Sequence, residues 1–327
     1  MSARLIPYNT RDYTAGSFVS EGRRMGRVIA IIGANGQLGS DLTRVRTAAS
    51  ASDELLGLTH RDIEVTDLKS VRAALQAGSP EVVINTSAYH RVDDVEVDPG
   101  HAFAVNVIGP RNLALACKDL DAVLIHVSTD YVFSGRKGKP YVESDPVDPI
   151  NMYGISKAAG EMAIRSLGPK HFIVRSSGLY GVAGPSGKGS NFVELMLRLA
   201  RKGKSIRVVN DQILTPTPTR VLAEQIFVLS RRREYGTYHA TCQGQCSWFE
   251  FARAIFDFAG LSPTLSPQAT SQSGAVAARP AFSVLDNQNL RLLGIDRFPS
   301  WRDGLKEYLS AQHLRMEQPE AANMPPN

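Results

Sequence analysis

The sequence predicts an α/β fold in which a doubly wound parallel sheet carries a smaller mixed α/β domain. Three observations lead to this prediction. Short, continuously apolar runs alternate with helical segments in the first half of the chain, as they do in parallel sheets covered on both faces. A glycine-rich turn follows the first apolar run, at residues 33–39. Beyond residue 176 the alternation stops, and loops and prolines become frequent, which indicates a second domain.

The first half of the chain contains the predicted strands, each a short apolar run with the composition of a buried strand. They are expected at residues 27–32, 55–58, 81–85, 122–127 and 171–175. Helices are expected after Gly39, at residues 67–75 with Asp67 as the N-cap, at 101–120 and at 151–166. Because a helix follows each strand, the strands should be parallel and the helices should cover both faces of the sheet.

The second half of the chain gives weaker signals. Helices are expected at 191–201, where the pattern is amphipathic, and at 221–229 and 248–259. We expect a glycine-rich loop at 181–190 and extended chain at 208–219. Little structure is expected at 262–280, and no long element should begin at Leu305. The predicted domains are residues 25–176 and, mainly, 177–312, with residues 205–235 packing back on the first domain. Residues 1–24 are expected to be a flexible extension, and residues 313–327 a disordered tail.

Composition limits the classes of function. The 327 residues are 43% hydrophobic and 21% charged, which is ordinary for a soluble globular protein. The net charge is +5, but no aromatic residues interleave with the basic run at 231–233, so we expect no nucleic-acid partner. No apolar segment is long enough for a membrane span or a secretory leader, which predicts a cytoplasmic protein without a membrane partner. The three cysteines lack a second pair of zinc ligands and are expected to be reduced thiols.

The glycine-rich turn is a candidate phosphate-binding site. Gly33, Gly36 and Gly39 follow the spacing G-x-x-G-x-x-G between a predicted strand and a predicted helix. Gly33 would permit a tight turn, Gly36 would let the backbone approach a pyrophosphate, and Gly39 would let the helix pack closely on the strand. The helix N-terminus would then face the phosphates. The turn therefore predicts a dinucleotide cofactor.

The end of the second strand indicates which dinucleotide binds. An acidic residue there would hold the ribose 2′-hydroxyl of NAD, but this chain has Thr59, His60 and Arg61. A cation and a hydroxyl suit the 2′-phosphate of NADP, so NADPH is expected and NADH is the alternative. Asp62 would bond the adenine amine, and Ile63 would cover the adenine ring. The competing interpretation of Arg61 is a solvated surface residue.

Polar residues also follow two later strands, at the same predicted edge of the sheet. Small residues at 85–89 would leave room for a cofactor, and the hydroxyls of Ser128 and Thr129 could polarise a substrate carbonyl or simply cap a turn. Tyr153 and Lys157 would share one face of a helix. A Lys ammonium there would lower the Tyr pKa, which suits proton transfer at neutral pH, although such a pair can also lie on a solvated face.

These motifs together resemble a known family. Gly33-x-x-Gly36-x-x-Gly39, Ser128-Thr129-Asp130 and Tyr153-x-x-x-Lys157 are similar to those of the extended short-chain dehydrogenases/reductases, which have a Rossmann cofactor domain. More narrowly, the segments 33–39, 128–135, 151–157 and 210–216 resemble those of the dTDP-4-dehydrorhamnose reductases. The likeness extends from about residue 26 to about residue 310.

The resemblance implies an oxidoreductase. It would reduce the 4-keto group of a nucleotide-activated deoxysugar with NADPH, in particular dTDP-4-dehydro-β-L-rhamnose to dTDP-L-rhamnose in polysaccharide biosynthesis. Tyr153 would protonate the C4 oxygen, Lys157 would tune Tyr153 and hold the nicotinamide ribose, and Thr129 would complete the catalytic triad. The implied cofactor contacts are Gly33, Asn35, Gly36, Gln37, Leu38, Gly39, Thr59, His60, Arg61, Asp62, Ile63, Ser87, Ala88, Tyr89, Tyr153 and Lys157. The implied substrate contacts are Thr129, Asp130, Val132, Phe133, Asn191, Asp211, Gln212 and Arg279.

Departures from the family pattern leave alternatives open. Gly178 stands where an aromatic residue is usual, Leu214 where a glycine is usual, and His90-Arg91 where Thr-Ala is common. The exact sugar and its nucleotide base are therefore not determined. An NADP-binding regulatory subunit without turnover and a nucleotide-sugar epimerase or dehydratase are the competing functions. The resemblance allows a homodimer linked by Mg²⁺, but no acidic cluster in the sequence indicates a metal site.

Overall fold

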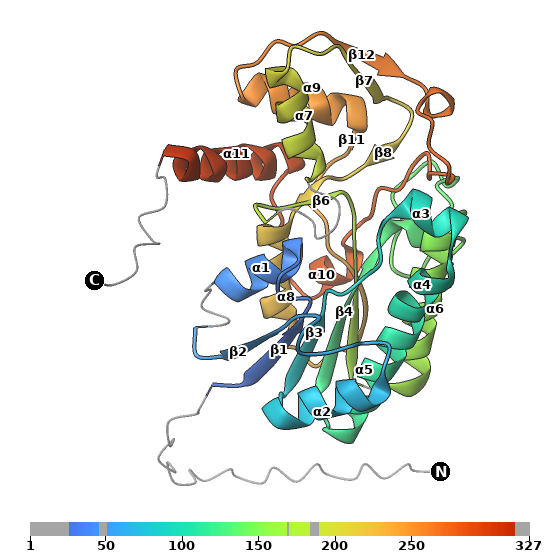
Figure 1. Ribbon diagram of the computed structural model, residues 1–327, viewed down its shortest axis with the longest axis vertical. Coiled ribbons are helices and arrows are strands. Elements are labelled where there is room, and N and C mark those ends of the chain that lie inside the picture. Colours follow the sequence, from blue (N-terminus) through green and yellow to red (C-terminus); the bar gives the residue numbers. More distant parts are fainter. Residues whose placement is uncertain (1–25, 46–50, 169, 184–189, 318–327) are drawn as a thin grey trace, which may run out of the picture.

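A computed structural model describes residues 26–45, 51–168, 170–183 and 190–317, with side chains given as far as residue 311. Its centre is a parallel sheet of strand order β10-β5-β4-β3-β1-β2 (Figure 1). These strands are β1 (Val28–Ile32), β2 (Glu54–Leu58), β3 (Val82–Asn85), β4 (Val123–Thr129), β5 (His171–Ser176) and β10 (Gly236–His239). The predicted α/β, doubly wound fold class is confirmed.

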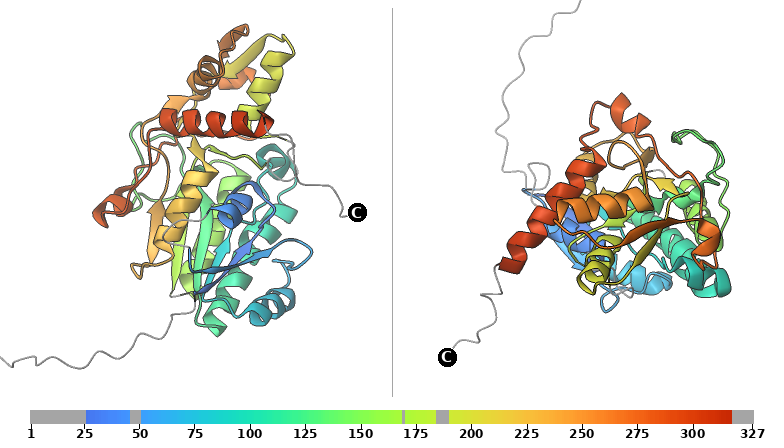
Figure 2. Two further views of the ribbon diagram at one scale, coloured as in Figure 1. Left: turned by 90° about the vertical axis from the view of Figure 1, so that its left-hand side faces the viewer. Right: turned by 90° about the horizontal axis from the view of Figure 1, so that it is seen from above.

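Helices cover both faces of this sheet (Figures 1 and 2). One face carries α2 (Leu68–Gly78), α5 (Gly109–Asp119) and α6 (Met152–Leu167); the other carries α1 (Gln37–Arg44) and α8 (Thr219–Leu229). Successive residues of β1 point to opposite faces, so Ile29 and Ile31 join the core beneath α1, whereas Ala30 and Ile32 join the core beneath α2. This alternation explains why the strand is apolar throughout.

Local capping fixes where two helices begin. The Asp67 carboxylate accepts a hydrogen bond from the Lys69 amide at the start of α2, as its position in the sequence predicted. The Asn151 side chain accepts a hydrogen bond from the Gly154 amide at the start of α6. The segment between β3 and β4 is also helical, with α3 (Val92–Val97), α4 (Gly100–Phe103) and a π-helical turn (Ala104–Ile108) ahead of α5.

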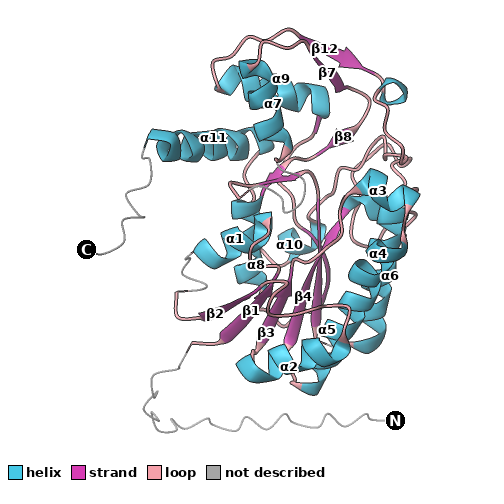
Figure 3. Cartoon of the chain, in the orientation of Figure 1, coloured by secondary structure: helices cyan, strands magenta, loops and turns pink. Residues whose placement is uncertain are grey.

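A second region lies beyond the carboxyl edge of the sheet, at the top of Figure 3. It contains the helices α7 (Phe192–Arg201) and α9 (Trp248–Phe258) and the strands β6 (Leu179–Tyr180), β7 (Ile206–Val209), β8 (Ile213–Leu214), β9 (Thr217–Pro218), β11 (Cys246–Ser247) and β12 (Leu265–Gln268). Helix α10 (Gln288–Leu292) instead packs on β10 of the central sheet. The apolar core beneath α1 continues into the second region through Met196 and Phe251. Among the described residues, no helix has the length and apolar character to cross a bilayer.

The C-terminal part of the chain corrects one expectation. Helix α11 spans Trp301–Glu317, where the sequence had suggested no long element and a disordered tail from residue 313. The Ser300 hydroxyl accepts a hydrogen bond from the Asp303 amide, which caps the first turn. Trp301, Leu305 and Tyr308 are buried at helical spacing, so burial of one face stabilises the helix. The remainder of the predicted tail, residues 318–327, and the predicted extension at 1–24 lie outside the described residues.

The segment 205–235 divides between the two regions. Helix α8 packs on α1 over the central sheet, whereas β7 pairs in parallel with β12 in the second region. Strand β12 lies in the stretch 262–280, where the sequence gave little structural signal, because it is a four-residue strand that includes a proline and depends on its partner. The next strand after α8, β10, pairs with β5 and completes the central sheet.

The sheet topology defines where a ligand can bind. The chain passes from β1 to β2 on one side of β1 and then crosses to β3 on the other side. In open parallel sheets, ligands bind beside the carboxyl ends of the strands at such a reversal. The turn after β1 and the residues after β3 and β4 all lie at this edge.

Candidate active site

The glycine-rich turn has the geometry of a phosphate cradle. Gly33 adopts a φ of +79°, and a Cβ there would approach the Thr86 hydroxyl to 2.8 Å. A Cβ on Gly39 would lie 2.1 Å from the Gly33 carbonyl oxygen, so only glycine allows this packing. No side chain caps the start of α1, and its first turn holds no acidic residue. The free amides at this helix N-terminus therefore suit an anionic phosphate group.

The loop after β2 holds the residues expected at the adenosine end of the cofactor. The Asp62 carboxylate accepts hydrogen bonds from the Thr59 amide (2.8 Å) and hydroxyl (2.7 Å), and these donors lower the Asp62 pKa. Its other oxygen remains available to a further donor. Arg61 is exposed and His60 is exposed beside it. Ile63 is only 3% exposed and packs in the core beneath α2, so it offers almost no surface to an adenine ring.

The loop after β3 is fixed by a residue that the sequence analysis did not single out. Asn106, in the π-helical turn, accepts a hydrogen bond from the Tyr89 amide and donates to the Tyr89 carbonyl oxygen, both at 2.9 Å. Its amide nitrogen also donates to the Ser156 hydroxyl at 3.0 Å. This buried side chain ties the loop that contains Ser87 and Ala88 to α6, the helix of the predicted catalytic pair.

The structure brings the predicted catalytic residues together at the sheet edge. Thr129 is the last residue of β4, and Tyr153 and Lys157 lie one turn apart on α6, which packs on β4. Lys157 is 1% exposed, and its Nζ donates to the Val127 carbonyl oxygen at 2.7 Å. Burial lowers the Lys157 pKa to about 8.

The expected effect of Lys157 on Tyr153 is not what the structure shows. Burial raises the Tyr153 pKa well above its ordinary value, and the neighbouring Thr129 hydroxyl offsets this only in part. The Lys157 amine donates to the Val127 carbonyl oxygen of β4 and does not offset this rise. A phenol is protonated at neutral pH even at its ordinary pKa, so the raised pKa makes Tyr153 a weaker acid in the empty site and does not itself favour proton donation.

Asp130 lies at the centre of a buried hydroxyl cluster rather than at a ligand surface. It accepts hydrogen bonds from Thr129 (3.0 Å), Ser177 (2.8 Å) and Ser283 (2.5 Å). Burial raises its pKa, and these three donors oppose that rise. Asp130 thus orients the Thr129 hydroxyl and joins β4 to two distant segments. The prediction that Asp130 lines the sugar pocket is not supported by this geometry.

Two neighbouring predicted substrate residues lie in the core rather than at a surface. Val132 and Phe133 were expected to line the sugar pocket, but both are 0% exposed. Phe133 stacks on Tyr141, with ring centroids 4.2 Å apart, and the Arg175 guanidinium lies over its ring. A short 3-10 turn after β4 (Asp130–Val132) directs these side chains into the protein, so they stabilise the loop and have no surface for a substrate.

The remaining predicted substrate residues have protein partners. Asn191 caps α7, and its amide donates to the Gly181 carbonyl oxygen and the Tyr308 hydroxyl, so it acts as a structural cap rather than a free ligand group. Asp211 and Gln212 both bond Thr270. These hydrogen bonds hold the loops of the second region.

Arg279 is a predicted substrate residue that links two distant segments of the chain. It forms an ion pair with Asp93 of α3 at 2.9 Å, and Asp93 also accepts hydrogen bonds from the Val276 and Ala277 amides. The contact connects the second region to the cofactor region close to Tyr131, whose ring lies edge-to-face on Tyr153. A diphosphate at this place would compete with Asp93 for the guanidinium.

A buried ion pair between Glu161 and Arg175 links α6, the helix of the predicted catalytic pair, to β5. Glu161, one turn after Lys157, accepts hydrogen bonds from Nε (2.9 Å) and Nη2 (2.7 Å) of Arg175 on β5. The Ser128 hydroxyl donates to the same carboxylate at 2.6 Å. This network ties α6, β4 and β5 together, and the sequence analysis missed it because no local pattern links residues on three elements.

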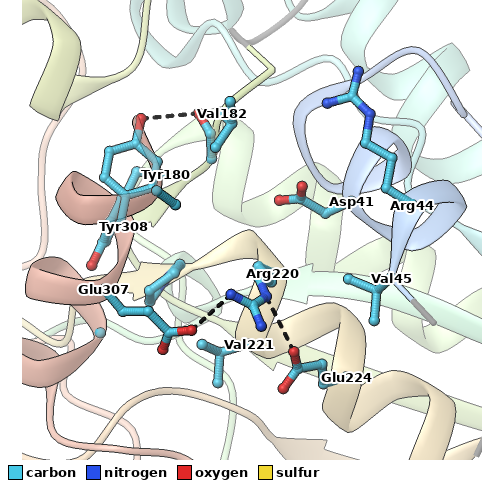
Figure 4. Close-up of a pocket in the computed structure, with 14 residues that line it drawn as sticks. Asp41, Arg44, Val45, Tyr180, Val182, Arg220, Val221, Glu224, Glu307 and Tyr308 are labelled. Carbon is cyan, nitrogen blue, oxygen red and sulfur yellow. Dashed lines mark hydrogen bonds and ion pairs between the residues drawn. The ribbon is translucent and has the colours of Figure 1, made fainter. Parts of the chain in front are cut away.

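The described residues contain no group of three or more potential ligands that could hold a metal ion. A cavity of about 360 Å³ lies away from the triad, between α1, α8 and α11 (Figure 4). Arg220 at its edge forms ion pairs with Glu224 and Glu307. The cavity includes none of the residues predicted from the sequence to contact cofactor or substrate.

Comparison with known proteins places this site in a family. The family model described as the RmlD substrate binding domain matches residues 27–314. The chain belongs to this family. A dTDP-4-dehydrorhamnose reductase of Streptomyces griseus is 40% identical over 288 residues, which are 86% of this chain and 92% of that protein. The spore coat polysaccharide biosynthesis protein SpsK of Bacillus subtilis is 40% identical over 281 residues, which are 86% of this chain and 96% of that protein.

A solved structure of an RmlD family member has the same architecture. The dTDP-4-dehydrorhamnose reductase of Bacillus anthracis, in complex with NADP, superimposes with a TM-score of 0.83 at 39% identity, over 88% of this chain and 100% of that chain. The resemblance inferred from the glycine turn, the Ser-Thr-Asp cluster and the Tyr-Lys pair is therefore confirmed at the level of the family. RmlD family membership also agrees with the Rossmann-type sheet and with the phosphate cradle after β1.

Proposed function

We propose that this chain is an NADPH-dependent reductase of a nucleotide-activated 4-keto sugar, in the first place dTDP-4-dehydro-β-L-rhamnose. The observation that carries the proposal is the convergence of Thr129, Tyr153 and Lys157 at the carboxyl edge of the parallel sheet, the same edge that carries the glycine-rich turn after β1. In the reaction a carbonyl becomes an alcohol, so the carbon gains a hydride and the oxygen gains a proton. NADPH, when bound, supplies the hydride.

The residues of the chain supply the proton and the positioning. Tyr153 donates its phenolic proton to the C4 oxygen as negative charge develops there. The Thr129 hydroxyl donates its single hydrogen to Asp130 in this structure, and on substrate binding it would turn that hydrogen to the C4 oxygen and so orient the keto group. Lys157 holds the nicotinamide ribose. The free amides after Gly36 bind the pyrophosphate, and the loop at 59–62 holds the adenosine ribose.

The preference for NADPH depends on Arg61 in this proposal. Arg61→Ala is expected to weaken NADPH binding about 10- to 100-fold, because one charge-assisted hydrogen bond to the 2′-phosphate is lost. NADH lacks that phosphate, so its dissociation constant should change little. Titration of both cofactors by tryptophan or nicotinamide fluorescence measures the two effects. Equal weakening for both cofactors would assign Arg61 a general structural role.

The nucleotide sugar and the cellular context are proposed on the same basis. The diphosphate of a nucleotide-sugar substrate would pair with the Arg279 guanidinium in place of Asp93. The reaction would take place in the cytoplasm as a step of polysaccharide biosynthesis. A homodimer is proposed as well, supported by the exposed apolar side chains of Ile155 and Met162 on α6. Sedimentation of the purified protein tests the dimer.

One assay tests the proposed reaction against its rivals. NADPH oxidation is followed with dTDP-4-dehydrorhamnose made in situ, and with GDP- and UDP-linked keto sugars in parallel. Turnover confined to the dTDP-linked substrate would support the proposal. Tightly retained NAD in the purified protein would favour an epimerase or dehydratase, and cofactor binding without oxidation of NADPH by any keto sugar would favour a regulatory subunit.

A further inference from the structure

Three buried polar side chains form a row from the cofactor loop to the catalytic lysine. The Asn85 Nδ2 atom at the end of β3 lies 3.0 Å from Nδ1 of His126 on β4. On the other side of the imidazole ring, His126 Nε2 lies 3.3 Å from Nζ of Lys157 on α6. Asn85 and His126 are both 0% exposed, so no solvent screens these contacts.

The neighbouring Ser87 fixes the orientation of Asn85. The Ser87 backbone amide lies 3.0 Å from Oδ1 of Asn85, and the Ser87 hydroxyl lies 2.6 Å from the same atom. A backbone N–H can only donate, so the Asn85 atom that faces it must be the oxygen. The other atom of the amide, Nδ2, is therefore the one that faces His126, and it donates to Nδ1.

This donor determines which nitrogen of His126 carries hydrogen. Burial lowers the His126 pKa well below its ordinary value, so the ring is neutral and has one N–H. Because Nδ1 accepts from Asn85, the hydrogen is on Nε2, which faces Lys157. A Lys ammonium has three donors and no acceptor, so it cannot accept from this N–H. An uncharged amine can, through its lone pair, while it still donates to the Val127 carbonyl oxygen.

The charged groups around Lys157 do not cancel the preference of the His126 N–H for an uncharged amine. Glu161 lies one turn further along α6 and favours the ammonium form, but Arg175 of β5 and Arg165 of α6 both bond its carboxylate. Tyr153, one turn before Lys157, is a neutral phenol at physiological pH. Val127 and His126 are the two groups of β4 within hydrogen-bond range of the amine.

We propose that His126 is a positioning residue for the reaction: its fixed Nε2–H orients the Lys157 amine and favours the uncharged form. Lys157 then exchanges its proton near neutral pH while its amine stays fixed against Val127 and His126 of β4. The inference depends on the role proposed above for Lys157. The structural basis of the inference, the tautomer of His126, is independent of turnover and can be tested separately.

The tautomer is measured directly by ¹⁵N NMR of the histidine side chains in the full-length protein, assigned by through-bond spectra. The expected result is a neutral Nε2–H ring for His126 across the neutral pH range. An Nδ1–H ring or a charged ring would overturn the proposal. This measurement needs no variant and no substrate, so failure of the proposed enzymatic function would not affect it.

Two variants test the consequence for Lys157. The titration midpoint of Lys157 is read from the ¹³Cε chemical shift of labelled lysine in two variants. His126→Leu removes the imidazole ring, and Asn85→Ala lets the His126 ring switch tautomer. Both midpoints are expected to rise by about one pH unit, because a hydrogen bond that favours the neutral amine is lost. His171→Gln is the matched control, because this histidine lies on β5 opposite Leu124 rather than His126 and contacts the Gly168 carbonyl oxygen, so the midpoint should stay unchanged. A midpoint that does not rise in Asn85→Ala and His126→Leu would overturn the proposal.

Discussion

Replacing Tyr153 with phenylalanine is expected to lower kcat by about 10²- to 10⁴-fold, the usual contribution of a positioned general acid. The ring of Tyr153 packs edge-to-face with Tyr131, and phenylalanine preserves this contact, so the pocket should keep its shape. NADPH binding should change little, because Lys157 and the glycine turn are unaffected. The measurement is steady-state NADPH oxidation together with a separate cofactor titration.

A matched substitution separates chemistry from packing. Tyr235→Phe removes a phenol whose ring packs against Phe172, remote from the triad, and kcat should stay at the parent value. If Tyr153→Phe kept the parent kcat, Tyr153 could not be the proton donor. If it lost cofactor binding in parallel with kcat, its role would be in holding NADPH rather than in proton transfer.

Replacing Glu161 with glutamine is expected to destabilise the protein by about 3–5 kcal/mol, since the buried Arg175 guanidinium would lose its countercharge. Arg175 is 2% exposed, so water cannot replace the carboxylate. The measurement is the free energy of unfolding from urea denaturation monitored by circular dichroism. Glu307→Gln is the matched control: its ion pair with Arg220 is exposed, and its loss should cost less than about 1 kcal/mol. Equal costs for the two variants would contradict this account.

The same pair makes stability depend on pH. Burial alone would raise the Glu161 pKa, but the hydrogen bonds from Arg175 and Ser128 outweigh it, and the pKa is lowered below the ordinary value. A carboxylate with a lowered folded-state pKa stabilises the protein above its unfolded pKa of about 4.3 and loses this contribution as pH falls through the folded pKa. The difference in stability between wild type and Glu161→Gln should therefore shrink in acid and be constant near neutrality.

Elements with strong local signals could be predicted from the sequence. Strands β1 to β5 are largely apolar runs, and the predicted cap Asp67 lies where its helix begins. Strand β10, Gly-Thr-Tyr-His, has no such run and was not predicted. The glycine turn and the Tyr153–Lys157 pair were predicted because their chemistry depends on short spacings along the chain. Helix α11 was missed although Trp301, Leu305 and Tyr308 have helical spacing, because few other signals support it.

The direction of individual side chains could not be predicted from the sequence. Phe133 follows the catalytic strand in the sequence, yet a single turn directs it into the core. Asp130 accepts hydrogen bonds from Ser177 and Ser283, which lie 47 and 153 residues further along the chain. A local pattern cannot show that three such residues meet, nor that Asn85 and His126 form a row with Lys157. These contacts arise only from the packing of β3, β4 and α6.

Strand β10 is the last strand of the central sheet to be translated, and this order affects folding during synthesis. Strand β5 can be translated and paired with β4, but its other edge has no partner until residues 236–239 emerge from the ribosome. Until then the nascent chain exposes an open strand edge, a template for pairing with other chains. A fragment that ends near residue 176 would keep this edge exposed permanently and would also lack α8 over the core beneath α1. The catalytic motifs thus belong to a unit whose folding is completed from the far half of the sequence, and a fragment of the first 176 residues should aggregate.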